Sequence, residues 1–221
     1  MPCCSSCCAG AREVFTAKVA EGDLRKYRRN GPNKTTRLLR DGIVAAGGGR
    51  TLLDIGGGVG ALSQELLARG FERSTIVDAS PAYQEVARRA SAESGLESRM
   101  EFREGDFVEH APQLGAADAV ALDRVVCCYP EYRPLLESAA SHGQRIFAYA
   151  YPRDRWYIRW VIAGENFFQS VMRRAFRAFV HPEPAMSAVL ATHGFRRVSR
   201  RTTFVWCADV YVRDGGTART S

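Results

Sequence analysis

The segment Asp54-Ile55-Gly56-Gly57-Gly58-Val59-Gly60 combines one acidic side chain with alternating glycines, a set of residues suited to holding a small ligand. It follows the apolar run Thr51-Leu52-Leu53 and precedes a helical pattern from Ala61 to Ala68, which predicts a strand, a tight turn and a helix start. Glycines allow positive φ and let a ligand contact the main chain, and a helix start offers N–H groups without intrahelical partners. Because the Asp54 carboxylate repels phosphate, the loop is better suited to an ammonium group or to a network of amides and water.

The segment can be compared with two known kinds of nucleotide-binding loop. A Walker-type loop needs Gly-Lys-Ser/Thr at its end, and this loop ends in Gly60-Ala61-Leu62, which excludes it. The dinucleotide fingerprint fits Gly56, Gly58 and Ala61 when alanine is allowed at the last place. The loop by itself therefore leaves a dinucleotide such as NAD open.

Acidic residues also follow the next three predicted strands. Asp78 ends the second strand, where a carboxylate can accept both hydroxyls of a ribose, and Asp106 follows the third, where it could accept from an adenine amine. Asp123 ends the fourth strand. Carboxylates thus stand at the C-terminal tips of four successive strands, which is where an open α/β sheet binds its ligand.

These motifs, in this order over residues 50 to 213, resemble class I S-adenosylmethionine-dependent methyltransferases. The resemblance implies S-adenosyl-L-methionine as cofactor, with Asp54 and the glycines holding its methionine part, Asp78 its ribose and Asp106 its adenine. The full set of predicted cofactor-binding residues is Asp54, Gly56, Gly58, Gly60, Asp78, Ala79, Asp106, Phe107 and Asp123.

The wider pattern after the glycine loop alternates between strands and helices. Strands are predicted at 51–55, 73–77, 100–103, 117–122 and 145–150, and helices at 61–69, 81–94 and 131–142. Residues 195–203 and 204–212 are two β-rich runs in succession, which predict a hairpin that closes the sheet. We therefore expect a Rossmann-like α/β fold, a doubly wound and mostly parallel sheet in three layers with a C-terminal antiparallel hairpin. The hairpin matches the methyltransferase family and is unusual for a dinucleotide domain.

Three regions are expected along the chain. Residues 1–49 form a Cys-rich segment and a helical lid with a break at Asn30-Gly31-Pro32, residues 50–213 form the methyltransferase domain, and residues 214–221 form a flexible tail. Within the domain, residues 151–184 are predicted to be a helical cap insertion. Apolar residues there follow helical spacing, which is compatible with a helix on a membrane surface, a cap over an apolar substrate, or plain core. This series is Trp156, Trp160, Ala163, Phe167, Val171, Arg174 and Ala178.

Charge is distributed unevenly along the 221 residues, whose net charge is +7. Residues 1–50 carry 10 Lys and Arg against 4 acidic residues, residues 51–144 carry 8 against 15, and residues 145–213 carry 12 against 4. The acidic middle is the predicted cofactor half, so the basic flanks would steer an anionic acceptor, although they are equally compatible with arginines that only solvate helices. No apolar run approaches the ~20 residues of a membrane span, and the N-terminus lacks the layout of a signal peptide, so a cytoplasmic protein is expected.

Nucleic acid is not expected as a partner. The sequence has no zinc-finger spacing and no basic strand interleaved with aromatic residues. Methyltransferases acting on base amines commonly carry Asp/Asn-Pro-Pro-Tyr/Phe after the fourth strand, where this chain has Cys127-Cys128-Tyr129-Pro130. The acceptor is therefore predicted to be a small molecule.

A narrower resemblance rests on Asp123-Arg124-Val125-Val126-Cys127-Cys128-Tyr129-Pro130, on Arg145-Ile146, on Tyr151-Pro152-Arg153 and on Arg177-Ala178-Phe179-Val180-His181. These segments look similar to magnesium-protoporphyrin O-methyltransferases, which methylate a propionate carboxylate on a flat apolar macrocycle. The family has His before Tyr-Pro, and this chain has Cys128 there. The resemblance is therefore interpreted as kinship and not as identity of substrate.

The reaction itself requires few protein groups. A sulfonium methyl is already activated, so in-line attack needs proximity, orientation and a dry site. The predicted catalytic residues are Tyr129 and Tyr27 as positioning hydroxyls, Arg124 as an anion clamp and His181 as general base. Each has a structural alternative: a Tyr-Pro pair can end a turn, Arg124 can pair with Asp123, and His181 can cap the next helix. O-methylation is favoured, because a carboxylate acceptor needs no base.

The cysteines allow a second hypothesis. Cys3, Cys4, Cys7 and Cys8 form a cluster with spacing suited to a soft metal. Together with Cys127 and Cys128 it raises thiol-dependent methylation of a metalloid as an alternative. A module that binds S-adenosylmethionine without transferring the methyl group is a third possibility, and the oligomeric state is left open.

Overall fold

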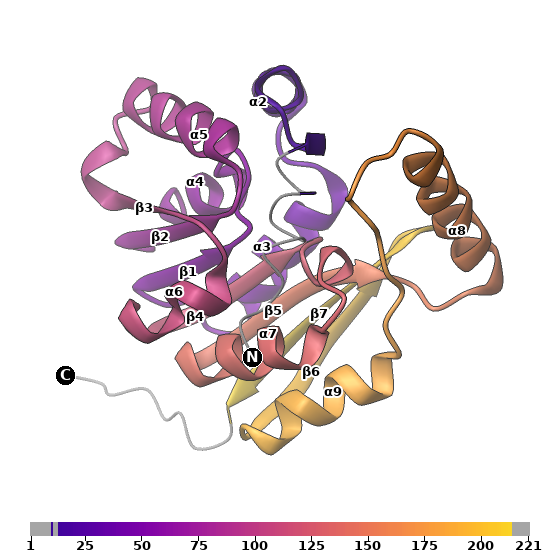
Figure 1. Cartoon of the computed structure of the whole chain (residues 1–221). Helices are drawn as coiled ribbons and strands as arrows, with labels where there is room; N and C mark the ends of the chain where they lie inside the picture. Colours follow the sequence, from indigo (N-terminus) through magenta and orange to yellow (C-terminus); the bar gives the residue numbers. More distant parts are fainter. Residues whose placement is uncertain (1–9, 11–12, 214–221) are drawn as a thin grey trace.

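The computed structural model describes residue 10 and residues 13–213, which form a seven-stranded sheet in the order β3-β2-β1-β4-β5-β7-β6 (Figure 1). The strands are β1 (Thr51–Ile55), β2 (Arg73–Asp78), β3 (Met100–Glu104), β4 (Ala117–Asp123), β5 (Gly143–Pro152), β6 (Phe195–Thr202) and β7 (Trp206–Arg213). The first five pair in parallel, whereas β7 is antiparallel to both β5 and β6. The predicted fold class is confirmed, and the predicted strands differ from these bounds by no more than a few residues.

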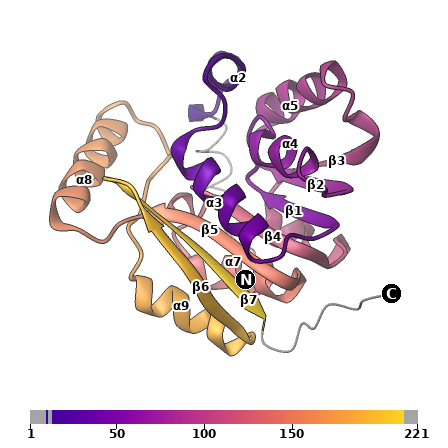
Figure 2. The same ribbon diagram turned by 180° about the vertical axis from the view of Figure 1, so that it is seen from behind.

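Helices cover both faces of the sheet (Figures 1 and 2). They are α2 (Ala17–Asn30), α3 (Lys34–Ala45), α4 (Ala61–Leu67), α5 (Pro81–Glu93), α6 (Phe107–His110), α7 (Tyr132–His142), α8 (Trp156–Val171) and α9 (Glu183–Thr192). The predicted break at Asn30-Gly31-Pro32 separates α2 from α3, and the Asn33 side chain caps α3 by accepting from the Thr36 N–H. The helices predicted at 61–69, 81–94 and 131–142 are confirmed as α4, α5 and α7, whereas the short α6 was not predicted.

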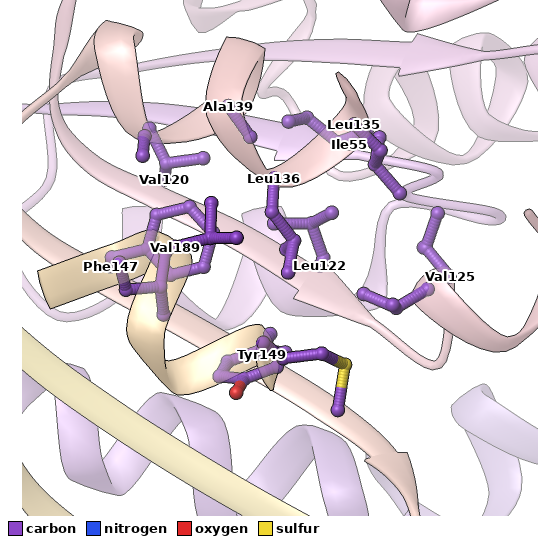
Figure 3. Close-up of a cluster of buried hydrophobic side chains, with 14 of the residues drawn as sticks. Ile55, Val120, Leu122, Val125, Leu135, Leu136, Ala139, Phe147, Tyr149 and Val189 are labelled. Carbon is purple, nitrogen blue, oxygen red and sulfur yellow. The ribbon is translucent and has the colours of Figure 1, made fainter. Parts of the chain in front are cut away.

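One face of the sheet carries the larger core. Side chains of α7 and α9, such as Leu136 and Val189, pack against Leu122, Phe147 and Tyr149 of the central strands (Figure 3). All of these side chains are buried. The large residues of β4 and β5 point to this face because side chains alternate along a strand.

The opposite face is lined by small residues and admits α3 at close range. Ala119 and Ala121 of β4 lie on this side, together with Leu39 and Ile43 of α3. An ideal Cβ at Gly42 of α3 would lie 2.6 Å from Val210 Cγ2 of β7. We conclude that α3 is a structural layer of the sheet, so the predicted role of a lid remains a prediction for α2 alone.

Helix α2 packs on α5 through a third, smaller cluster. Ala20 and Leu24 of α2 contact Tyr83 and Val86 of α5, and the Tyr83 hydroxyl donates to Asp23 at 2.6 Å. This contact places α2 beside the glycine loop, because Val59 belongs to the same cluster. Of the two N-terminal helices, α3 thus packs on the sheet, and α2 packs on α5 beside the glycine loop.

Helix α8 stands away from the sheet, beside the β6–β7 turn (Figures 1 and 2). Its helix ends at Val171, before the Arg174 and Ala178 of the predicted series. Only Ile158 and Gln169 are buried in it, so the interpretation of this apolar series as core is wrong. Within residues 13–213, none of the helices is long and apolar enough to cross a bilayer.

Candidate functional site

The glycine loop adopts the backbone that its sequence predicts. Gly56, Gly58 and Gly60 have φ values of 62°, 56° and 75°. These values lie in the left-handed region, which residues with a Cβ rarely adopt. An ideal Cβ at Gly56 would lie 2.5 Å from Val125 Cγ2, so this position also requires glycine for close approach. The loop therefore presents bare main chain at the tip of β1.

Asp54 is a buried carboxylate with one satisfied oxygen. Oδ2 accepts from the Ser63 hydroxyl at 2.7 Å. The Ser63 hydroxyl in turn accepts from the Ser74 hydroxyl at 2.8 Å. Oδ1 is buried and has no hydrogen-bond partner among the described residues. Burial raises the pKa of Asp54 to about 7, and the negative charge of Asp123 adds to the shift, while the bond from Ser63 opposes it. Ser63 was missed in the sequence, because a single serine in a helix is not distinctive.

Asp78 organises the loop from the tip of β2. Its Oδ2 accepts from the Gly58 N–H at 3.0 Å, and its Oδ1 accepts from the Ser80 N–H at 2.9 Å. Burial raises the pKa of Asp78, and these two amide donors oppose the rise. A carboxylate oxygen has a second lone pair, so Asp78 can hold the loop and still accept from hydroxyl groups of a ribose. Ala79 follows it directly at the strand end.

Asp106 and Tyr129 are brought together. Asp106 caps α6 by accepting from the Val108 N–H at 2.9 Å, and the Tyr129 hydroxyl donates to the same Oδ1 at 2.9 Å. Asp106, which is predicted to bind the adenine, and Tyr129, which is predicted to position the acceptor, are therefore neighbours. The Phe107 side chain is buried in the core against His142, with ring centroids 5.9 Å apart, so its backbone is the part left to face a cofactor.

Asp123 and Arg124 lie at the tip of β4. The Thr36 hydroxyl donates to Asp123 Oδ2, whereas Asp123 Oδ1 is buried and has no hydrogen-bond partner in the described chain. Arg124 Nε lies 3.4 Å from that Oδ1, an ion pair without the geometry of a hydrogen bond. Arg124 has a φ of 64°, unusual for a residue with a side chain, and its guanidinium carbon lies 5.9 Å from the centroid of the Trp206 ring.

Asp54 and Asp123 stand on the neighbouring strands β1 and β4. Each presents one buried carboxylate oxygen that receives no hydrogen bond from the residues described. A buried anion without a donor is costly, and an ammonium group supplies both charge and donors. This pair therefore fits the amino group of the methionine part of S-adenosylmethionine, beside a loop whose bare backbone allows close contact.

His181 is engaged by the loop after β4. Its Nε2 lies 2.8 Å from the Tyr129 carbonyl oxygen, and its ring packs between Phe179 and Tyr132, with centroids 5.8 and 4.8 Å away. A carbonyl only accepts, so Nε2 carries the proton and Nδ1 is the one nitrogen that could act as a base. Burial lowers the pKa of His181, and hydrogen bonds with the backbone of Tyr129 and Val126 oppose this shift. The ring holds the loop backbone rather than capping α9, and its role as general base stays a prediction.

Tyr27 lies on the cofactor side, against α4. Its hydroxyl donates to Glu65 Oε1 at 3.3 Å, and burial followed by the Glu65 charge raises the pKa of Tyr27 to about 12. It is therefore a neutral donor at ordinary pH. Two further residues of this region, Thr36 and Tyr83, were missed because their partners Asp123 and Asp23 are distant in sequence.

The predicted metal ligands Cys3, Cys4, Cys7 and Cys8 lie outside the described residues. Cys127 and Cys128 place their sulfur atoms 4.0 Å apart beside the predicted acceptor mouth. A hydrogen bond with Cys127, followed by burial, raises the pKa of the Cys128 thiol. Within the described ranges, no three His, Cys, Asp or Glu side chains converge in a way that could hold a metal ion.

Comparisons with known proteins support a methyltransferase fold. Residues 52–143 match the family model described as a methyltransferase domain. The fold is similar to that of a magnesium protoporphyrin IX methyltransferase from Synechocystis PCC 6803 with bound SAH, at 21% identity and a TM-score of 0.72, covering 92% of this chain and 98% of that one. An O-methyltransferase family protein from Burkholderia thailandensis is similar at 19% identity and a TM-score of 0.69, covering 94% of this chain and 60% of that one. A search of curated proteins returned no match.

Proposed function

We propose that the chain is a class I S-adenosylmethionine-dependent methyltransferase whose acceptor is a small, anionic and partly apolar molecule that is methylated on oxygen, since residues 52–143 match a methyltransferase domain. The observation that carries this proposal is Arg124. It is a cation in a strained backbone conformation, beside the half-buried Asp123 and over the Trp206 ring. Strained residues with side chains concentrate at functional sites, and this one offers a carboxylate partner next to a flat apolar surface.

A carboxylate acceptor suits the residues around the loop after β4. The bound cofactor supplies an activated methyl group. A carboxylate oxygen of the acceptor would take this methyl group directly, with a methyl ester as the product and S-adenosylhomocysteine as the leaving group. No proton moves, so the reaction needs no base, and the protonated Nε2 of His181 is no obstacle.

In this proposal, four carboxylates bind the cofactor and one arginine binds the acceptor. Asp54 and Asp123 hold the ammonium group, Asp78 accepts from the ribose hydroxyls, and Asp106 faces the adenine. Arg124 binds and orients the acceptor carboxylate. The likeness to a magnesium protoporphyrin IX methyltransferase supports a carboxylate on a flat macrocycle as the first acceptor to try.

The test measures release of S-adenosylhomocysteine with a panel of amphiphilic carboxylates, the matching amides and simple amines. We expect turnover with a carboxylate and none with its amide. Arg124→Gly removes the cation and relieves the positive φ, so the fold should tolerate it. We expect the KM for the acceptor to rise about tenfold or more, because a charge-assisted hydrogen bond is lost, while the Kd for S-adenosylmethionine changes little.

Arg124→Lys is the matched control, since it keeps the charge and loses the planar fork. An intermediate KM for this variant would support the carboxylate clamp. Turnover of neutral acceptors that is insensitive to Arg124→Gly would contradict the proposal without affecting the assignment as a methyltransferase.

A further inference from the structure

A continuous set of large apolar side chains is exposed on α8 and on the β6–β7 turn. We call this set the aromatic surface. Its members, with their exposed fractions, are Trp156 (73%), Trp160 (73%), Phe167 (71%), Phe168 (58%), Val171 (62%) and Phe204 (76%). A soluble chain rarely leaves so many large apolar groups in water on one element, so the surface indicates an interaction site.

The helix and the turn form one surface. The Tyr157 and Phe204 rings stack with centroids 5.3 Å apart, and Trp156 lies edge-on to Tyr157 at 5.8 Å. Arg153, just before α8, donates to the Thr203 carbonyl oxygen at 3.1 Å. These contacts fix the N-terminal end of α8 to the hairpin, so its exposed residues are presented on a firm base.

Charge at the aromatic surface is strongly positive. Residues 153–177 contain six arginines against two acidic residues. Arg173 and Arg174 are exposed and form no salt bridge with a carboxylate within the described part of the chain. Exposed aromatic residues flanked by unpaired arginines match the headgroup region of an anionic bilayer, where rings insert and guanidinium groups meet lipid phosphates.

A second copy of this chain is less well matched as the partner. In a twofold interface the same patch faces itself, so the unpaired arginines of both copies would approach each other. Such like-charge contacts oppose association. The charge of the surface therefore favours a negatively charged partner.

We propose that the aromatic surface docks the enzyme on anionic lipid bilayers, with α8 lying in the plane of the interface. This is a peripheral attachment, and it does not depend on which acceptor is methylated. Trp206, the residue next to the turn, also lies under Arg124 at the predicted acceptor mouth. Docking would hence bring that mouth close to the lipid headgroups.

The test uses the full chain and vesicles of phosphatidylcholine with or without phosphatidylglycerol. The sequence contains three tryptophans, Trp156, Trp160 and Trp206, and all lie on α8 or the adjoining hairpin, so intrinsic fluorescence reports on the surface directly. We expect a blue shift and co-sedimentation with phosphatidylglycerol vesicles, weak binding to phosphatidylcholine alone, and loss of binding at high salt.

Two pairs of variants separate the contributions of rings and charge. Trp160→Ala with Phe204→Ala should reduce binding to phosphatidylglycerol vesicles at least about tenfold, whereas Val19→Ala with Val44→Ala, two exposed apolar residues of α2 and α3, should not. Arg173→Glu with Arg174→Glu should reduce it at least about tenfold, since each basic residue near an anionic surface contributes roughly fivefold. Arg37→Glu with Arg73→Glu makes the same change in net charge elsewhere on the surface.

Binding of S-adenosylmethionine by every variant confirms that it is folded. Equal vesicle binding by the surface and control variants would overturn the proposal. So would a concentration-dependent dimer that Trp160→Ala dissociates in the absence of any vesicle binding, since the partner would then be a second copy.

Discussion

At the scale of single residues, the predicted cofactor site contains a carboxylate, Asp54, whose negative charge destabilises the folded chain. Asp54 is buried, one of its oxygens lacks a hydrogen-bond donor among the described residues, and Asp123 adds like charge nearby. A site that binds an ammonium group gains affinity from this arrangement, because the ligand supplies the positive charge and the hydrogen-bond donors that the buried carboxylate lacks. The stability of the ligand-free protein should therefore depend on the charge of Asp54.

We expect Asp54→Asn to stabilise the ligand-free protein near neutral pH. The folded pKa of Asp54, about 7, lies above its ordinary value of 3.8, so the folded state binds more protons between these values. Stability therefore falls as pH rises from about 4 to 7, by about 4 kcal/mol at most, and stays low above that range. Thermal melts should show Asp54→Asn above wild type at about pH 8, with a difference that shrinks toward pH 5.

Ser63→Ala provides the contrast, because it removes the hydroxyl that donates to the carboxylate. It should lower the melting temperature more at about pH 8 than at about pH 5, since the ionised form needs the donor more. In calorimetry Asp54→Asn should bind S-adenosylmethionine more weakly. A shift of the same size at both pH values would show that Asp54 is not the titrating group.

At the scale of elements, α3 connects the N-terminal segment to the cofactor site. Its Thr36 hydroxyl donates to Asp123 Oδ2, the carboxylate at the tip of β4. Gly42 allows the same helix to approach β7 closely. Helix α3, which was predicted as part of a helical lid, is thus packed on the sheet and positions Asp123, a predicted cofactor-binding residue.

Thr36→Val should therefore weaken cofactor binding without touching the cofactor. The substitution keeps the shape and removes the donor to Asp123, a loss of about 1 kcal/mol or about fivefold in the Kd for S-adenosylmethionine. Thr36→Ser, which keeps the hydroxyl, should bind nearly as wild type. Unchanged affinity in Thr36→Val, measured by calorimetry, would show that Asp123 needs no positioning from α3.

Two helical glycines give a matched test of the packing. Gly42→Ala in α3 places a Cβ 2.6 Å from Val210 and should destabilise the fold by about 1–3 kcal/mol. Gly22→Ala in α2 has no neighbour within 4 Å and should stabilise by about 0.5–1 kcal/mol, because alanine is the better helix former. Urea unfolding measures both. Equal effects of the two substitutions would contradict the close packing of α3 on β7.

The elements also show what the sequence could predict. Strands β1, β2 and β4 were located correctly because buried parallel strands are short apolar runs, and their acidic ends marked the cofactor edge. The partners of Asp54 and Asp123 were not found, because Ser63 and Thr36 meet them through tertiary packing that leaves no local pattern. For α8 the periodicity was right and the burial was wrong, since an apolar stripe does not specify what covers it.

At the scale of the whole molecule, an acidic cofactor half lies between two basic flanks. Arg124 is a half-exposed cation within this acidic half, and it forms an ion pair with Asp123 at the tip of β4. The positive field of the basic flanks would concentrate anionic molecules near the predicted acceptor mouth. This field is long-ranged, so salt weakens it.

The last prediction concerns this field and rests on the proposed acceptor. For an amphiphilic carboxylate, kcat/KM should fall severalfold when ionic strength rises from about 0.01 M to about 0.15 M, because the Debye length shortens from roughly 30 Å to roughly 8 Å. The Kd for S-adenosylmethionine should change less, since Asp54, the carboxylate proposed to hold its ammonium group, is buried and buried pairs are screened less. Arg173→Glu with Arg174→Glu should reduce the salt dependence more than Arg37→Glu with Arg73→Glu if the flank containing α8 steers the acceptor. An equal reduction by both pairs would mean that net charge alone attracts the acceptor, and no salt dependence in wild type would mean that Arg124 recognises it only after contact.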